Sequence, residues 1–131
     1  MRKTEWPYAN FTEAEMACKC CGKSYMDPGF MKKLQKLRDA VGFPLAVSSG
    51  YRCEAHNLKV SSTGTKGPHT TGQAADVLVS GDRAYKVVAE ATKLGFTGIG
   101  VSQKGSHAGR FIHIDTLPNG PGCPRPTTWS Y

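Results

Sequence analysis

The sequence lacks long apolar segments. None of its 131 residues belongs to an apolar run that approaches the ~20 residues needed to span a bilayer. Its opening stretch, MRKTEWPYANFTEAE, is polar and has no apolar segment of the signal-peptide type. We therefore expect one domain, residues 1–131, that is synthesised in the cytoplasm without a signal peptide. If it acts outside the cytoplasm, another agent must release it.

Acidic residues are also few. The chain has 10 Asp and Glu against 17 Lys and Arg, which leaves a net charge of +7. Such a surplus favours a polyanionic partner, either nucleic acid or an anionic cell envelope. The basic residues are scattered, however, and form no run typical of a nucleic-acid-binding arm. Nucleic acid is therefore not expected as the partner, and a charged surface that only aids solubility is the alternative.

Cysteine is present in an odd number, which argues against a complete disulfide framework. Three of the thiols lie close together in the segment CKCCGK. They indicate a structural zinc site completed by a more distant cysteine, reduced thiols in a tight loop, or one disulfide formed after release. The spacing C-x-C-C differs from the paired C-x-x-C knuckle and disfavours zinc. The five cysteines are Cys18, Cys20, Cys21, Cys53 and Cys123.

The apolar pattern predicts an amphipathic helix after Asp27, which would be its N-cap, with Pro28 at the first helical position. Gly42 would end this helix. A shorter helix is predicted earlier, because Thr12 and Glu15 form the T-x-x-E pattern of a capping box. The apolar face of the main helix consists of Phe30, Leu34, Leu37 and Val41.

A further helix is predicted from Asp82, as its cap, to Gly95. Residues 53–73 are polar and rich in Gly, Ser and Thr, so a long loop is expected there. This order of elements predicts an α+β fold, with a small, mostly antiparallel sheet and helices packed on one side. The expected strands are 44–48, 74–79, 97–101 and 110–115.

Two of these strands carry residues suited to metal binding. Side chains alternate along a strand, so Asp76 shares a face with Ala74 and Leu78. A carboxylate on an apolar face is costly to bury unless another charge compensates it, and a metal ion does so well. His69 precedes this strand and can fold back toward it, because Gly72 allows the chain to turn.

The last expected strand has the same pattern. Phe111, His113 and Asp115 point to one face, and the residues between them are apolar. Two imidazoles and one carboxylate, from His69, His113 and Asp76, would leave a fourth position for water. That arrangement is typical of catalytic zinc, whereas structural zinc sites have four protein ligands.

These segments resemble a known family. The run S-G-Y-R-C, then H-x-x-G-x-A-x-D, then F-I-H-I-D resembles the zinc D-alanyl-D-alanine carboxypeptidase family, which includes phage endolysins and other murein endopeptidases. The resemblance extends to residues 11–18 and 34–38 and so covers most of the chain. The matching residues are Ser49, Gly50, Tyr51, Arg52, His69, Gly72, Ala74, Asp76 and His113.

The resemblance implies a zinc site in the central cleft, formed by His69, Asp76 and His113. It also implies that Arg52 contacts the substrate and stabilises developing negative charge, for which a planar guanidinium is well suited. Ser49 and Tyr51, in the same run, are expected to help bind the substrate. The alternative for Arg52 is a donor that only holds its loop.

One position departs from the family pattern. Many members have an acidic residue three positions before the last His, where it acts as the general base, but this chain has Arg110 there. Arginine cannot accept a proton at working pH. Asp115, on the same strand face as His113, is the first candidate for the base, and it could instead orient that imidazole. His107, just upstream, is the second candidate.

The expected function is zinc-dependent hydrolysis of peptide bonds in bacterial peptidoglycan, as in an endolysin or a D-Ala-D-Ala carboxypeptidase. Stem peptides and an anionic envelope would be the partners, and the protein would act as a monomer. The alternative is a non-catalytic, zinc-binding module that binds the cell wall and has lost its general base.

Overall fold

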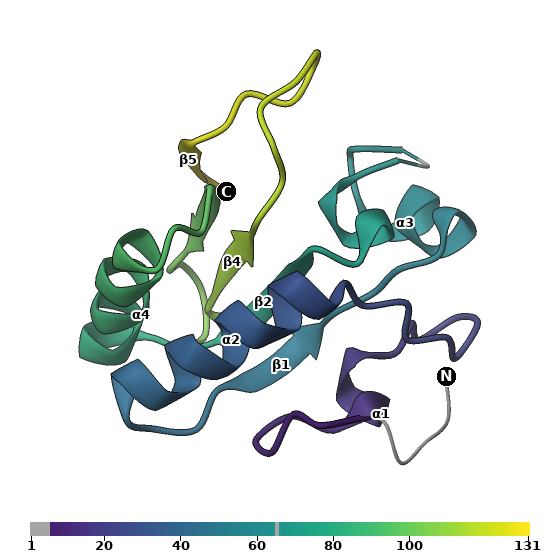
Figure 1. The fold of residues 1–131 in the computed structure, drawn as a ribbon. Helices are drawn as coiled ribbons and strands as arrows, with labels where there is room; N and C mark the ends of the chain where they lie inside the picture. The colour runs from purple at the N-terminus through teal and green to yellow at the C-terminus, as the bar shows by residue number, and fades with distance from the viewer. Residues whose placement is uncertain (1–5, 65) are drawn as a thin grey trace.

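The computed structural model describes residues 6–64 and 66–131 and has an α+β fold around one five-stranded sheet (Figure 1). The strand order is β1-β2-β4-β3-β5. All pairs are antiparallel except β3 with β5, which is parallel. The predicted fold class is therefore confirmed. The strands are β1 (Ala46–Ser49), β2 (Ala74–Leu78), β3 (Gly98–Ser102), β4 (Phe111–Asp115) and β5 (Thr127–Ser130).

The helices include the two that were predicted near the N-terminus. The capping box of Thr12 and Glu15 is present at the start of the first. At the second, the Asp27 side chain accepts a hydrogen bond from the Phe30 amide, and Gly42 ends the helix at φ 77°. The helices are α1 (Glu13–Met16), α2 (Pro28–Val41), α3 (Glu54–Val60) and α4 (Gly81–Lys93), and short 3-10 turns form η2 (Pro68–Thr71) and η3 (His107–Gly109).

The hydrophobic core lies between the sheet and helices α2 and α4. The odd-numbered side chains of β2 and the even-numbered ones of β4 enter it, because neighbouring residues of a strand face opposite sides. Val77, Ile112 and Ile114 are fully buried there against Leu34 of α2 and Val87 of α4. Each such burial contributes about 1.5–3 kcal/mol. The opposite face of the same strands is thereby left for polar residues.

One loop prediction and one predicted helix start were wrong. Residues 53–73 are not one loop, since they contain α3 and η2. Helix α3 was missed because it has no apolar stripe: Leu58 and Val60 are 60% and 54% exposed, while its buried residue is Asn57. Helix α4 begins two residues earlier than expected, because its N-cap is Ser80 and not Asp82. Asp82 lies inside the first turn, where its negative charge interacts favourably with the helix dipole.

The segment after Leu117 is rich in Pro and Gly, and its sequence predicted no strand, but the chain returns to the sheet as β5. Trp129 of β5 lies beside Gly100 of β3, and a Cβ on that glycine would collide with the indole ring. The return therefore depends on a residue without a side chain in β3. It brings residues near the C-terminus to the polar face of the sheet.

None of the helices that the structure describes is both long enough and apolar enough to cross a bilayer.

Candidate functional site

Asp76 and His113 lie directly opposite one another in the β2–β4 pairing. The His113 Nδ1 atom is 3.0 Å from the Asp76 Oδ1 atom. Both side chains project from the sheet face opposite Val77 and Ile112, away from the hydrophobic core. Asp76 is 7% exposed and His113 is 2% exposed, so the pair is almost completely removed from solvent.

His69 reaches the same carboxylate from η2. Its Nε2 atom lies 3.3 Å from Asp76 Oδ1, and its Nδ1 atom lies 2.8 Å from the carbonyl oxygen of Gly50. Gly72 connects η2 to β2 in the left-handed conformation, at φ 75°, and a Cβ there would collide with the carbonyl of Tyr25. This close turn is what folds His69 back over the strand.

These three side chains fit a zinc ion. One ligand atom of each lies within 4.8 Å of the other two, and all three residues are buried. Nitrogen and oxygen donors from two imidazoles and a carboxylate are the ligands of catalytic zinc sites. The hydrogen bond to Gly50 leaves Nε2 of His69 for the metal. Asp115 occupies Nε2 of His113, so that the Nδ1 atom, which faces Asp76, is the one available to a metal.

A second carboxylate holds His113 from behind. Asp115 Oδ2 is 2.8 Å from His113 Nε2, and both carboxylate oxygens accept hydrogen bonds from Arg125, each at 2.9 Å. The amide of Leu117 donates to Asp115 Oδ1 as well. Asp115 is completely buried. Its carboxylate occupies space that a Cβ on residue 98 would fill, so this position requires Gly98. Its oxygens are therefore all engaged, as in the carboxylate–histidine pairs that orient metal ligands.

Mutual charge compensation sets the pKa values of this cluster. Burial raises the pKa of Asp76, but the hydrogen bonds and charges of His113 and His69 outweigh it, and the pKa falls well below its usual range. Burial likewise raises the pKa of Asp115, and His113 and Arg125 bring it below the ordinary value. Burial lowers the pKa of His113, but the opposing effects of Asp115 and Asp76 are larger, so that the pKa lies above its ordinary value. The two carboxylates therefore favour the protonated form of His113.

Arg52 is brought to the centre as well. Its NH2 atom lies 3.5 Å from Asp76 Oδ2, its Nε donates to the Ser49 hydroxyl, and its NH1 donates to Asn57 Oδ1. The hydroxyl of Ser49 thus holds the guanidinium in place. The Tyr51 ring, by contrast, packs edge-to-face against the Tyr25 ring, with ring centroids 5.3 Å apart.

The remaining candidate, His107, is exposed in η3 and lines a surface pocket with Leu78 and Arg83. Within the described residues, no hydrogen bond joins its side chain to the metal ligands. Arg110 is directed away from the centre too, because its guanidinium donates two hydrogen bonds to the carbonyl of Gly105. Neither side chain is placed beside the metal ligands by these contacts.

Sequence reasoning missed Arg125, Trp129 and Asn57. The guanidinium of Arg125 lies 5.3 Å from the Trp129 ring centroid, and that ring is 5.1 Å from the ring of His113. The only signal was an Arg and a Trp in a segment otherwise rich in Pro and Gly, and nothing in that composition indicates a return to the sheet.

A protein-family model described as Peptidase M15 matches residues 9–115. The chain therefore belongs to the peptidase M15 family, whose members are zinc-dependent. The match includes His69, Asp76 and His113 and stops at Asp115, so that Arg125 and Trp129 lie beyond it. A search among curated proteins gave no match.

The first prediction concerns the metal ligands. His69→Ala, Asp76→Ala and His113→Ala should each lower the zinc content by about one ion per chain, because two protein ligands do not form a stable zinc site. Elemental analysis after dialysis measures this loss, and His56→Ala, in α3, is the control. Full zinc content in any of the three variants would remove that residue from the site.

The second prediction concerns pH. In the metal-free protein the raised pKa of His113 means that its imidazolium stabilises the fold fully below about pH 6.5, and that this contribution is lost as the pH rises through the raised value. Thermal unfolding with a chelator should show a falling Tm over that range. With zinc the trend should reverse, because the metal replaces the proton. The same slope with and without zinc would contradict this competition.

Proposed function

We propose that this M15 peptidase hydrolyses peptide bonds in bacterial peptidoglycan. The observation that carries the proposal is the position of Arg52 beside a group of side chains that offers three zinc ligands from the described part of the chain. Such a site has room for a water molecule and a substrate carbonyl. When bound, zinc supplies a Lewis acid for a scissile carbonyl and for the attacking water.

Arg52 would bind the anionic part of the substrate. The side chain is 16% exposed, so it is partly open to a ligand while Ser49 and Asn57 hold two of its nitrogens. A guanidinium fixed in this way presents a planar set of donors to a carboxylate or to a developing oxyanion. Peptidoglycan stem peptides end in a carboxylate, which makes them suitable ligands for this residue.

Asp115 would act as a positioning residue, not as the general base. Its oxygens are occupied by His113, Arg125 and the Leu117 amide, and its lowered pKa makes it a weak proton acceptor. By fixing one nitrogen of His113, it would direct the other toward the metal. Arg125 would in turn hold Asp115.

The net charge of +7 suits a protein that approaches an anionic cell envelope. A small basic peptidase of this kind would act as a monomeric, endolysin-like enzyme on the wall after release from the cell that made it. Scattered surface charges of this type are screened by salt, so attachment to the wall would weaken as ionic strength rises.

A second function is favoured by one observation. Arg110 replaces the family's acidic residue and is bound to Gly105, while Asp115 is fully engaged. A chain that keeps the metal but has no free base would bind the wall without cutting it.

The third prediction separates these two functions. Zinc-loaded protein incubated with purified peptidoglycan should release soluble peptide fragments, and mass spectrometry should identify the bond that is cut. The variant Asp76→Ala is the matched control, because it removes a metal ligand. Zinc-bound, folded protein that stays attached to the wall and releases no fragment would instead support the non-catalytic module.

The fourth prediction tests the role of Asp115. Asp115→Asn and Arg125→Gln should weaken zinc binding or lower turnover by about 10–100-fold, as is typical for groups that orient metal ligands. Excess zinc should restore much of the rate, and Arg125→Lys should retain part of it. If Asp115→Asn binds zinc normally but loses turnover at every zinc concentration and loses the acidic limb of the pH profile, Asp115 is the base.

A further inference from the structure

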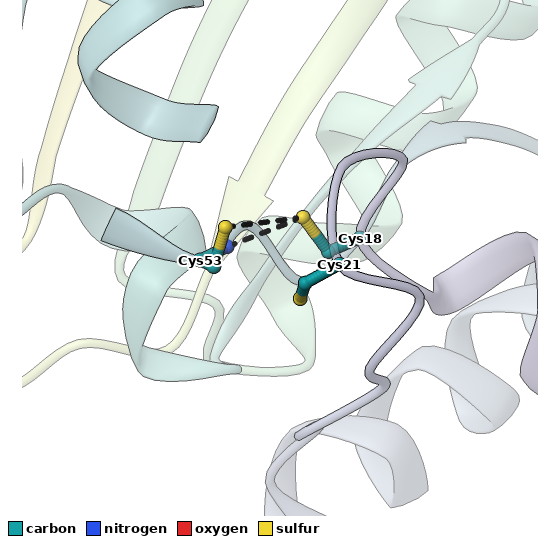
Figure 2. A group of neighbouring side chains, drawn as sticks. All are labelled: Cys18, Cys21 and Cys53. Atoms are coloured by element: carbon teal, nitrogen blue, oxygen red, sulfur yellow. Dashed lines mark hydrogen bonds between the residues drawn. The ribbon is translucent and has the colours of Figure 1, made fainter. Parts of the chain in front are cut away.

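A second cluster of metal-binding side chains lies outside the His and Asp centre. Cys18 and Cys21 come from the loop that follows α1, and Cys53 immediately precedes α3 (Figure 2). Their three sulfur atoms lie within 4.8 Å of one another, and those of Cys18 and Cys53 are 3.7 Å apart. Three thiols from two distant parts of the chain therefore meet at one point.

The local backbone around Cys18 has the form of a metal-binding turn. Cys18 and Cys21 are separated by two residues and followed by Gly22, so the segment contains C-x-x-C-G, which the spacing C-x-C-C had obscured. Gly22 has φ 75°, and its amide donates to the Cys18 carbonyl at 2.8 Å. The Cys18 amide in turn donates a hydrogen bond of 2.7 Å to the carbonyl oxygen of Lys23. This tight turn directs both thiols to the same side.

Backbone donors surround the Cys18 sulfur. The amides of Cys20 and Cys53 lie 3.4 Å and 3.3 Å from Cys18 Sγ and donate hydrogen bonds to it, the second of which is drawn in Figure 2. Such donors stabilise a thiolate, which is the form of cysteine that binds metals. Burial raises the pKa of Cys18, but the amides of Cys53, Cys21 and Cys20 outweigh it and lower the pKa to about 7.

We propose that Cys18, Cys21 and Cys53 bind a second, structural zinc ion, with Cys20 as its fourth ligand. The Cys20 amide lies 3.4 Å from Cys18 Sγ, which places this residue next to the three thiols. Its own side chain is exposed and lies outside the group of three, so it would have to turn toward them to complete the site. Four thiolates form the closed coordination of structural zinc and leave no position for a substrate. This site is separate from the proposed peptidase chemistry.

The thiolate site would connect the N-terminal segment to the residue that binds substrate. Arg52 is joined directly to Cys53, and the preceding Tyr51 amide donates to the Met16 carbonyl at 2.9 Å. Gly50 lies so close to Met16 that a Cβ would meet its backbone. The metal would therefore hold the segment around Arg52 against the loop after α1, and would add a link between parts of the chain 35 residues apart.

The alternative to zinc binding is a disulfide between Cys18 and Cys53, which would leave Cys20 and Cys21 as free thiols. It differs from the zinc site in mass, in thiol count and in metal content. A disulfide also gives no reason for the C-x-x-C-G turn, because it uses only one of the two turn cysteines.

The fifth prediction tests the second site by metal content and not by activity. Protein purified under reducing conditions with zinc should retain one zinc ion more than the His and Asp centre holds. In the variant His69→Ala, which lacks a ligand of the first centre, that zinc should remain. Cys21→Ser should lose it, and Cys123→Ser, which changes a cysteine outside the cluster, should keep it. Cobalt added to the metal-free protein should give a sulfur-to-cobalt charge-transfer absorption that Cys21→Ser lacks.

Circular dichroism of Cys21→Ser checks that the variant folds, and the cobalt spectrum of the unmodified chain is a test that needs no variant. Retention of zinc by His69→Ala together with the charge-transfer band supports the site. Absence of both overturns it. A mass two hydrogens lower, with two thiols lost and no zinc retained by His69→Ala, overturns it in favour of the disulfide. Since none of these readouts is catalytic, failure here leaves the peptidase proposal untouched.

Discussion

The buried carboxylate of Asp76 is the constraint on which the polar half of this molecule depends. It lies in the middle of the sheet, within reach of His69, His113 and Arg52. A charge in such a place is stable only if opposite charges or a metal ion compensate it. Each of those partners arrives from a different element, so the positions of η2, β4 and the segment before α3 all converge on this single group. Burial of the apolar residues on the other face of the sheet offsets the cost of burying this carboxylate.

The pairing of opposite charges continues from His113 through Asp115 to Arg125, near the C-terminus. A histidine between two carboxylates needs a further cation, and Arg125 provides it by binding Asp115 with two nitrogens. That contact is possible because Gly98 leaves space for the carboxylate and because β5 returns to the sheet. The parallel edge strand therefore has an electrostatic role as well as a role in pairing. The family match ends at residue 115, so this outer layer belongs to the part of the chain beyond it.

The sequence predicted features that depend on local chemistry and missed those that depend on distant pairing. Helix α2 followed from Asp27 and Gly42 and from its apolar spacing, and the metal ligands followed from an acid and a histidine on strand faces. Helix α3 and strand β5 were missed, because the first buries Asn57 instead of an apolar stripe and the second is stabilised by its partner β3. The hold of Arg125 on Asp115 likewise depends on a long-range return of the chain that no local pattern encodes.

Arg52, which we propose binds the substrate, lies between the His and Asp centre and the cysteine cluster, and contacts from these two reach its side chain and the adjoining Cys53, respectively. On one side, Asp76 attracts its guanidinium, and Ser49 and Asn57 orient it. On the other side its backbone continues into Cys53, whose amide and thiol both contact Cys18. A flexible arginine loses considerable side-chain entropy when it binds an anion. Restraint from both sides would remove part of that loss before the substrate arrives, so the cysteine cluster would strengthen substrate binding without touching the substrate.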